Sequence, residues 1–185
     1  MSSENVQATH IALSEGYLLV DSKKCQGCQA CMMVCSMVHE GEASLSLSRI
    51  QVMQNIIKKW PDDVKIVQCR QCANPLCVKA CPTGALHVDT ANGNIRIIDG
   101  PKCDGCRKCI EACPFLPQRI MWNPKAGKAI KCDLCLNTPY WHEKGGPGGK
   151  QACAEICPQG IIKFTRKVPN QRADAGYDLD LSGKV

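Results

Sequence analysis

Sixteen cysteines in four groups of four constrain this 185-residue chain more than any other feature of its sequence. Each group has a Cys-x-x-Cys pair, a third cysteine, three further residues and a fourth cysteine, and only the gap before the third cysteine varies. Aromatic residues make up only 4% of the chain, so something other than large side chains must fill the interior. Motifs one to four are, in order, Cys25, Cys28, Cys31 and Cys35; Cys69, Cys72, Cys77 and Cys81; Cys103, Cys106, Cys109 and Cys113; and Cys132, Cys135, Cys153 and Cys157.

This spacing is typical of iron–sulfur ligation. Two residues between thiolates let one irregular turn aim both sulfurs at a metal centre, and a close third cysteine completes three corners of a cubane. The fourth cysteine, one helical turn further on, points away and reaches a second cluster, as in the bacterial ferredoxin run CxxCxxCxxxCP. Four such motifs predict four 4Fe-4S clusters.

Proline follows the fourth cysteine in three motifs, as Pro82, Pro114 and Pro158. A proline there fixes φ, removes an N–H group and ends the short helix. Motif one has Ser36 in that place. We therefore expect a different chain path after Cys35, with the ligand itself kept.

Structural zinc and disulfides are the alternative uses of these thiols. A zinc site takes two Cys-x-x-Cys pairs and has no use for a third cysteine followed by xxxCP. Neighbouring thiols on one turn are poorly placed to form disulfides with distant partners. The N-terminus MSSENVQATHIALSEGYLLV has no features of a signal peptide, and no run reaches the ~18 apolar residues of a membrane helix. We expect a cytoplasmic protein without direct membrane insertion.

The formal net charge of +6 counts every cysteine as a neutral thiol. Four oxidised clusters at about −2 each lower the charge of the loaded protein to about −2. The basic residues then compensate the clusters, and we expect no nucleic-acid partner, because no nucleic-acid motif accompanies the charge. Five cations flank ligands and either favour the reduced clusters or balance surface charge: Lys102, Lys108, Lys131, Arg70 and Arg107.

Short strands and single helical turns are expected between the motifs. Residues 86–88 and 95–98 predict a hairpin around Asn92-Gly93, and one helical turn is expected before each fourth cysteine, as at 78–80 and 110–112. The fold class is therefore α+β with a cluster-dominated core. Further strands are expected at 16–20, 47–53, 64–67 and 160–164.

Three other features carry weaker signals. Residues 143–150 (EKGGPGGK) fail the spacing of a phosphate-binding loop and predict a flexible insertion in motif four. His39 and Glu40 form a proton-shuttle pair or, as we favour, a solvated polar pair. Cluster shielding and ordinary core packing are equally good interpretations of Trp60, Trp122 and Trp141. No motif indicates a site that transforms a substrate.

The four motifs, with the second written CRQCANPLCVKACPTGA and the fourth split by an insertion, resemble the electron-transfer subunits of molybdenum and tungsten pterin enzymes. The stretch CQACMMVCSMVHEGEASLSLSRIQV is most similar to the small iron–sulfur subunits of tungsten aldehyde oxidoreductase and class II benzoyl-coenzyme A reductase type enzymes. The resemblance covers about residues 15–165. It implies an electron relay to or from a larger catalytic subunit with a tungsten or molybdenum pterin, and allows a further donor or acceptor subunit.

The resemblance also implies two pseudo-symmetric ferredoxin-like modules. Residues 15–60 with 125–168 would form the outer module, residues 61–124 the inner module, and residues 169–185 a polar tail. Motifs one and four exchange their last cysteines, as do motifs two and three. The implied ligand sets are set 1, Cys25, Cys28, Cys31 and Cys157; set 2, Cys69, Cys72, Cys77 and Cys113; set 3, Cys103, Cys106, Cys109 and Cys81; and set 4, Cys132, Cys135, Cys153 and Cys35. Set 1 faces the catalytic subunit in similar proteins.

Two other functions remain open. A free-standing polyferredoxin would shuttle electrons between enzymes, although the long segment 36–68 and the polar tail favour docking. A carrier linked to hydrogenase or carbon monoxide dehydrogenase would use the same motifs. Tungsten or molybdenum in a copurifying protein would indicate the electron-transfer subunit of a pterin enzyme, and nickel would indicate the carrier linked to hydrogenase or carbon monoxide dehydrogenase.

Overall fold

The structure is a computed structural model that describes residues 11–172 and 176–178. Its helices are short and its strands form five antiparallel pairs, so the predicted α+β class with short helices and hairpins is confirmed. The helices are α1 (Ala30–Glu40), α2 (Leu76–Lys79), α3 (Lys108–Glu111) and α4 (Ala152–Ile156). The strands are β1 (Tyr17–Val20), β2 (Ile50–Gln54), β3 (Val64–Gln68), β4 (Leu86–Asp89), β5 (Ile95–Ile98), β6 (Met121–Asn123), β7 (Lys128–Ile130), β8 (Ile162–Thr165), β9 (Asn170–Arg172) and β10 (Gly176–Asp178).

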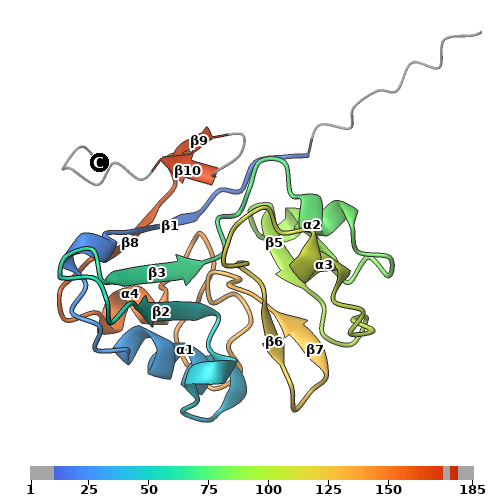
Figure 1. Cartoon of the computed structure of the whole chain (residues 1–185). Helices are drawn as coiled ribbons and strands as arrows, with labels where there is room; N and C mark the ends of the chain where they lie inside the picture. The colour runs from blue at the N-terminus through green and yellow to red at the C-terminus, as the bar shows by residue number, and fades with distance from the viewer. Residues whose placement is uncertain (1–10, 173–175, 179–185) are drawn as a thin grey trace, which may run out of the picture.

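The strand pairs are distributed around the molecule rather than joined into one sheet. Strand β1 pairs with β8, and each other pair is a hairpin of consecutive strands: β2–β3, β4–β5, β6–β7 and β9–β10. In Figure 1, α1, α4, β2 and β3 lie on the same side of the molecule as β1 and β8, whereas α2, α3, β5, β6 and β7 lie on the other. Among the helices of the described residues, none is long and apolar enough to cross a bilayer.

The strands predicted from alternating and β-branched residues are present. Leu86 pairs with Ile98 in the predicted hairpin, and Tyr17 pairs with Thr165 across the ends of the chain. The β6–β7 hairpin was not predicted, because each of its strands has only three residues. Its turn contains Gly127 at φ +63, a conformation that glycine adopts at no steric cost.

Helix α1 is much longer than the single turn expected before Cys35. It continues through Ser36 to Glu40, because no proline interrupts it there. The Ser36 hydroxyl donates to the Met33 carbonyl at 2.9 Å and accepts from the Ser44 amide at 2.9 Å. Gly41, in the left-handed region at φ +73, ends the helix. The serine therefore changes the chain path after Cys35 by extending the helix.

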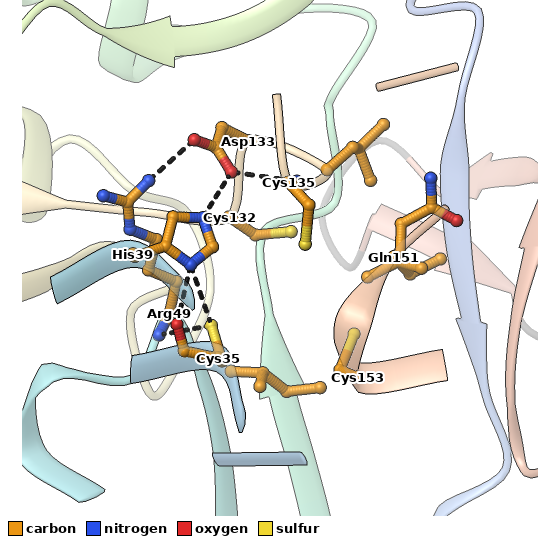
Figure 2. Close-up of a pocket in the computed structure, with 11 residues that line it drawn as sticks. Cys35, His39, Arg49, Cys132, Asp133, Cys135, Gln151 and Cys153 are labelled. Carbon is orange, nitrogen blue, oxygen red and sulfur yellow. Dashed lines mark hydrogen bonds and ion pairs between the residues drawn. The ribbon is translucent and has the colours of Figure 1, made fainter. Parts of the chain in front are cut away.

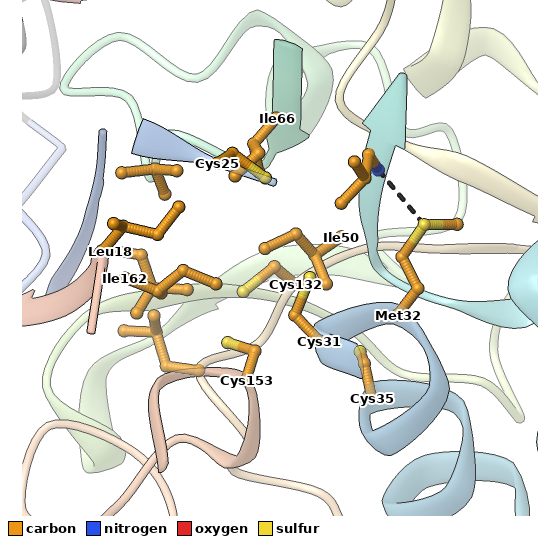
Figure 3. Packing of buried hydrophobic residues seen from close by; sticks show 14 of the residues in the cluster. Leu18, Cys25, Cys31, Met32, Cys35, Ile50, Ile66, Cys132, Cys153 and Ile162 are labelled. Carbon is orange, nitrogen blue, oxygen red and sulfur yellow. Dashed lines mark hydrogen bonds between the residues drawn. The ribbon is translucent and has the colours of Figure 1, made fainter. Parts of the chain in front are cut away.

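The largest core cluster consists of strand side chains and cysteines together (Figure 3). Leu18, Ile50, Ile66 and Ile162 come from four different strands and surround the buried thiols of motifs one and four. A smaller cluster around Leu86 includes thiols of motifs two and three. In both clusters, cysteines take positions that aliphatic side chains fill in an ordinary core.

Two of the module boundaries predicted from the sequence lie in hairpin turns. The boundaries after residues 60 and 124 lie in the turns of the β2–β3 and β6–β7 hairpins. In the predicted tail 169–185, residues 170–172 and 176–178 pair as β9 and β10. The rest of that tail, 173–175 and 179–185, lies outside the described residues.

Candidate metal centres

All four motifs share a local design. The Cys-x-x-Cys pair lies on a loop, and the third cysteine lies in the short helix that follows, within α1, α2, α3 or α4. Each of the four loops has a non-glycine residue in the left-handed region: Gln29, Gln71, Arg107 and, in motif four, both Leu134 and Cys135. Gly105, at φ +75, lies so close to the Gly127 carbonyl that any Cβ would overlap it. These turns bring the thiols of one loop and the following helix to the same place.

The thiols of set 1 approach one another in the structure. Burial and the neighbouring thiols of Cys25, Cys157 and Cys28 together raise the pKa of the Cys31 thiol to about 12. Cys157 belongs to motif four and is 126 positions from Cys31 in the numbering. The fold thus brings the last cysteine of motif four to the first three of motif one.

The thiols of set 2 also gather across two motifs. Burial, Cys69 and Cys113 raise the pKa of the Cys72 thiol to about 12. The pKa of Cys77 is likewise raised to about 12 by burial and by Cys69, Cys72 and Cys113.

The thiols of set 3 line one shared hollow. Burial and the neighbouring thiols of Cys103, Cys81 and Cys106 together raise the pKa of the Cys109 thiol to about 11. The same four cysteines line a pocket together with Leu86, Ile98 and Ala129. The fourth cysteine of motif two is therefore among the first three of motif three.

Set 4 also lines a shared hollow (Figure 2). The sulfurs of Cys35, Cys132, Cys135 and Cys153 point toward a common space between α1, α4 and the 132–135 loop. All four residues are at most 9% exposed. Burial raises the pKa of Cys153 well above its usual value, and Cys135, Cys132 and Cys35 raise it further.

These sites fit an iron–sulfur cluster on the chemistry of their donors. Each set contains a buried or partly buried thiol with a raised pKa, namely Cys31, Cys77, Cys109 or Cys153, and bound metal supplies the positive charge that such thiols need to become thiolates. Backbone N–H groups point at the sulfurs, from Gly27 to Cys25 at 3.4 Å and from Leu86 to Cys81 at 3.3 Å. Such N–H groups hold thiolates and cluster sulfur in place. The residues present therefore match the group that the spacing predicts.

A buried ionic network adjoins set 4, and it corrects the expectation of a solvated His39–Glu40 pair (Figure 2). His39 is 6% exposed, and its Nε2 donates to Asp133 Oδ1 at 2.9 Å, while its Nδ1 lies 2.7 Å from the Cys35 carbonyl and 3.7 Å from Cys35 Sγ. Both ring nitrogens thus face acceptors. Arg49 donates to Asp133 Oδ2 at 2.7 Å and to Glu40 at 3.3 Å.

The pKa values in this network follow from its charges. Burial alone would lower the pKa of His39, but the hydrogen bonds to Asp133 and Cys35 raise it to about 9. Burial alone would raise the pKa of Asp133, but His39 and Arg49 lower it to about 2. Burial also opposes ionisation of Cys35, yet His39 and Arg49 hold its pKa below the usual thiol value. The network therefore favours the thiolate form of Cys35.

Basic residues near the cysteines are placed differently from the sequence-based expectation. Lys102, Lys108 and Arg107 are exposed, whereas Lys131 is only 2% exposed and is no surface charge. Arg119, which the sequence analysis did not single out, is 5% exposed and its backbone N–H points at Cys113 Sγ at 3.3 Å. It lies six residues beyond its nearest cysteine, so adjacency in the sequence gave no signal.

The three tryptophans have three different environments. Trp60 is 66% exposed, so it neither shields a cluster nor packs in the core. The Arg107 guanidinium lies over the Trp122 ring, with its Cζ 4.0 Å from the ring centroid. Trp141 packs against the small cluster of Val38, Cys135 and Ala152. Only Trp122 and Trp141 therefore lie beside the cysteine loops.

The glycine-rich insertion 143–150 is anchored, which corrects the expectation of a flexible loop. Gly145 and Gly146 are buried, and the Gly146 amide donates to the Leu134 carbonyl at 2.8 Å. The Gln151 side chain donates to the Gly146 carbonyl at 3.0 Å. The insertion therefore packs against the loop that carries Cys135.

Replacing Gly145 with alanine is expected to destabilise set 4, because the new Cβ would overlap the Cys135 carbonyl. Overpacking of this kind costs about 1–3 kcal/mol. The readouts are iron per chain and the temperature at which cluster absorbance is lost. Gly148→Ala in the same loop meets nothing within 4 Å and is the control. Equal behaviour of the two variants would contradict the packing role.

Comparison with protein-family models agrees with the cysteine pattern. A model described as "4Fe-4S dicluster domain" matches residues 63–167, more than half of the chain. A second, described as "4Fe-4S binding domain", matches residues 22–38, around motif one. Together they cover all four motifs.

Several curated proteins are similar over most of the chain. The thiosulfate reductase electron transfer subunit PhsB of Salmonella typhi is 34% identical over 80% of this chain and 74% of that protein. The aliphatic sulfonate oxidoreductase polyferredoxin-like subunit of Pyrococcus furiosus is 36% identical over 76% of this chain and 70% of that protein. The hydrogenase-2 operon protein HybA of Escherichia coli O157:H7 is 32% identical over 80% of this chain and 50% of that protein.

A solved structure also matches, at lower similarity. It is the active site complex BamBC of benzoyl coenzyme A reductase in complex with benzoyl-CoA, 22% identical, with a TM-score of 0.44 over 81% of this chain and 78% of that chain. A score at this level does not establish a shared arrangement. The pseudo-symmetric pair of modules and the tungsten or molybdenum partner therefore stay predictions.

Proposed function

The chain belongs to the 4Fe-4S dicluster-domain family, the iron–sulfur electron-transfer subunits of oxidoreductase complexes, and from that premise we propose that it relays electrons through four clusters to or from a pterin-containing catalytic subunit. The metal of that pterin would be tungsten or molybdenum. The proposal is supported by thiols of different motifs that lie near enough to raise one another's pKa, as Cys157 does for Cys31 and Cys81 for Cys109.

Sets 1 to 4 are proposed as the ligands of one 4Fe-4S cluster each. Bound clusters supply reversible one-electron transfer, and the chain supplies thiolates, N–H donors and exclusion of water. Two modules are proposed on the same basis, one built on motifs one and four and the other on motifs two and three. The deep burial of set 4 and the exposure of Cys28 and Cys106 mean that these sets differ in access to solvent.

The proposed order of the sets along the relay is 3, 2, 4, 1. Cys69 of set 2 raises the pKa of Cys132 in set 4, and Cys31 of set 1 raises the pKa of Cys153 in set 4. Sets 2 and 3 are joined by packing of α2 against α3. The two end sets carry the exposed thiols, Cys106 in set 3 and Cys28 in set 1. Electrons would therefore enter at one exposed end and leave at the other.

The partner proposal rests on what the relatives are. PhsB is an electron transfer subunit of thiosulfate reductase, and the Pyrococcus furiosus protein is a subunit of aliphatic sulfonate oxidoreductase. We assign the Cys28 end to the catalytic subunit and the Cys106 end to a second donor or acceptor. HybA supports the alternative of a hydrogenase-linked carrier, although the chain spans half of that protein.

Metal analysis of the anaerobically purified native protein tests this function. The expected result is about sixteen irons per chain and paramagnetic signals after reduction with dithionite. Tungsten or molybdenum in a copurifying larger subunit supports the pterin partner, and nickel supports the hydrogenase-linked carrier. Far fewer than about sixteen irons, or no paramagnetic signal, would overturn the four-cluster relay.

A further inference from the structure

Buried lysine and arginine side chains are concentrated near one of the four cysteine sets. Among the residues that the structure describes, the buried lysines and arginines are Arg96, Arg119 and Lys131, at 1%, 5% and 2% exposed. The Arg96 guanidinium donates to the carbonyls of Asn94 and Ala12. The other two side chains lie beside the cysteines of set 2.

Arg119 faces set 2 from the side of Cys113. Its backbone N–H points at Cys113 Sγ at 3.3 Å, and its guanidinium lies 5.4 Å from the Phe115 ring centroid. Its Nε and Nη1 are buried and have no hydrogen-bond partner among the described residues. The thiols of Cys113, Cys69 and Cys72 act electrostatically on this guanidinium. Two unpartnered donors beside three thiols indicate that an anion belongs there.

Lys131 approaches set 2 from behind the Cys69–Cys72 loop. Its Nζ donates to the Arg96 carbonyl and, at 2.9 Å, to the Cys132 carbonyl. Gln71, inside that loop, uses the same two neighbours: its side chain donates to the Cys132 carbonyl at 3.1 Å and accepts from the Arg96 amide at 2.8 Å. The ammonium is therefore fixed against this loop, and its charge lowers the pKa of the Cys72 and Cys77 thiols relative to burial alone.

The other sets have no such excess of buried positive charge in the part of the chain described. At set 4, two cations, Arg49 and His39, are balanced by two carboxylates, those of Asp133 and Glu40. Cations beside set 3, such as Lys102 at 66% side-chain exposure, are screened by solvent. Backbone N–H to sulfur contacts occur at every set, for example from Gln71 to Cys69 at 3.5 Å and from Arg49 to Cys35 at 3.4 Å. Charge, not hydrogen bonding, therefore distinguishes set 2.

We propose that Arg119 and Lys131 are potential-setting residues and make the centre at set 2 the most easily reduced of the four. The inference rests on the proposed function, because it assumes a cluster at each set. A reduced 4Fe-4S cluster carries one more negative charge than the oxidised cluster, so fixed buried cations favour reduction. Set 2 then holds the electron longest, between the exposed end at set 3 and the deeply buried set 4.

The test is a redox titration of the anaerobically purified full chain, followed by electron paramagnetic resonance. Arg119→Gln should lower the reduction equilibrium constant of the most positive couple at least tenfold. For one electron this is a fall in its potential of about 59 mV. Arg119→Lys keeps the charge and should change the reduction equilibrium constant of the same couple less than threefold. Lys131→Met and Lys131→Arg should repeat this contrast.

Lys102→Met is the matched control, because Lys102 and Lys131 each immediately precede a cysteine but differ in exposure. Lys102→Met should change the reduction equilibrium constant of every couple less than threefold. If Arg119→Gln instead loses about four irons, the missing couple should be the most positive one. An unmoved most positive couple, or movement or loss of another couple, would overturn the inference. A wild-type chain without four couples would overturn the proposed function itself.

Discussion

Replacing Cys109 with alanine is expected to remove at least about four irons per chain and to weaken a second cluster. Cys109 is a proposed ligand in set 3, and its thiol is also 8% exposed within a core cluster. That cluster contains Leu86, Ile120 and Ala129, and thiols of motif two pack against it. Losing the ligand therefore also removes packing between sets 2 and 3. Iron and sulfide analysis after anaerobic purification measures both effects.

Cys106→Ala is the matched control for this prediction. Cys106 is a proposed ligand of the same cluster, but it is exposed and is not a member of that core cluster. Its loss should affect one cluster and leave the couples of the other three unchanged. A Cys109→Ala chain that loses fewer than about four irons would contradict the assignment. Identical losses in both variants would remove the packing argument but keep the ligand assignment.

Asp133→Ala is expected to lower the thermal midpoint by on the order of 10 °C. Asp133 accepts hydrogen bonds from His39, Arg49 and the Cys135 amide, and its removal leaves the buried His39 and the partly buried Arg49 with one fewer carboxylate. Breaking a buried ion pair in this way costs about 3–5 kcal/mol. Each kcal/mol shifts the midpoint of a chain of this size by roughly 2–4 °C. Anaerobic melting followed by cluster absorbance is the measurement.

The exposed Lys125–Glu42 pair offers the comparison for Asp133. Its Nζ and Oε1 atoms are only 2.6 Å apart, but the two side chains are 67% and 41% exposed. Glu42→Gln should therefore shift the midpoint by less than about 2 °C, because solvent screens exposed pairs. An Asp133→Ala chain that melts within 2 °C of the wild type would show that the network contributes little stability.

Local pattern explains what could be predicted from the sequence. The cysteine spacing needs only one loop and one helical turn, so it indicated the four motifs without any long-range information. The hairpin of β4 and β5 followed from alternating apolar residues around Asn92-Gly93. The pairing of β1 with β8 was not predicted, because nothing in either strand identifies a partner about 145 positions away.

Long-range contacts explain what was missed near the metal centres. In the sequence, His39 is a polar residue that follows a motif. Because α1 extends to Glu40, His39 lies one helical turn from Cys35 and contacts it. The 132–135 loop supplies its other partner, Asp133. The absence of proline at position 36 was the available signal for that longer helix. For Arg119 there was no such signal, since its environment depends on how motifs two and three meet.

The pairing of β1 with β8 bears on the biogenesis of the protein. Tyr17 can pair with Thr165 only after the roughly 145 residues between β1 and β8 have been translated, whereas β4 and β5 can pair as soon as they leave the ribosome. The proposed clusters that combine motifs one and four can therefore be completed only after Cys157 has been synthesised. The nascent chain has to keep its early thiols reduced until then.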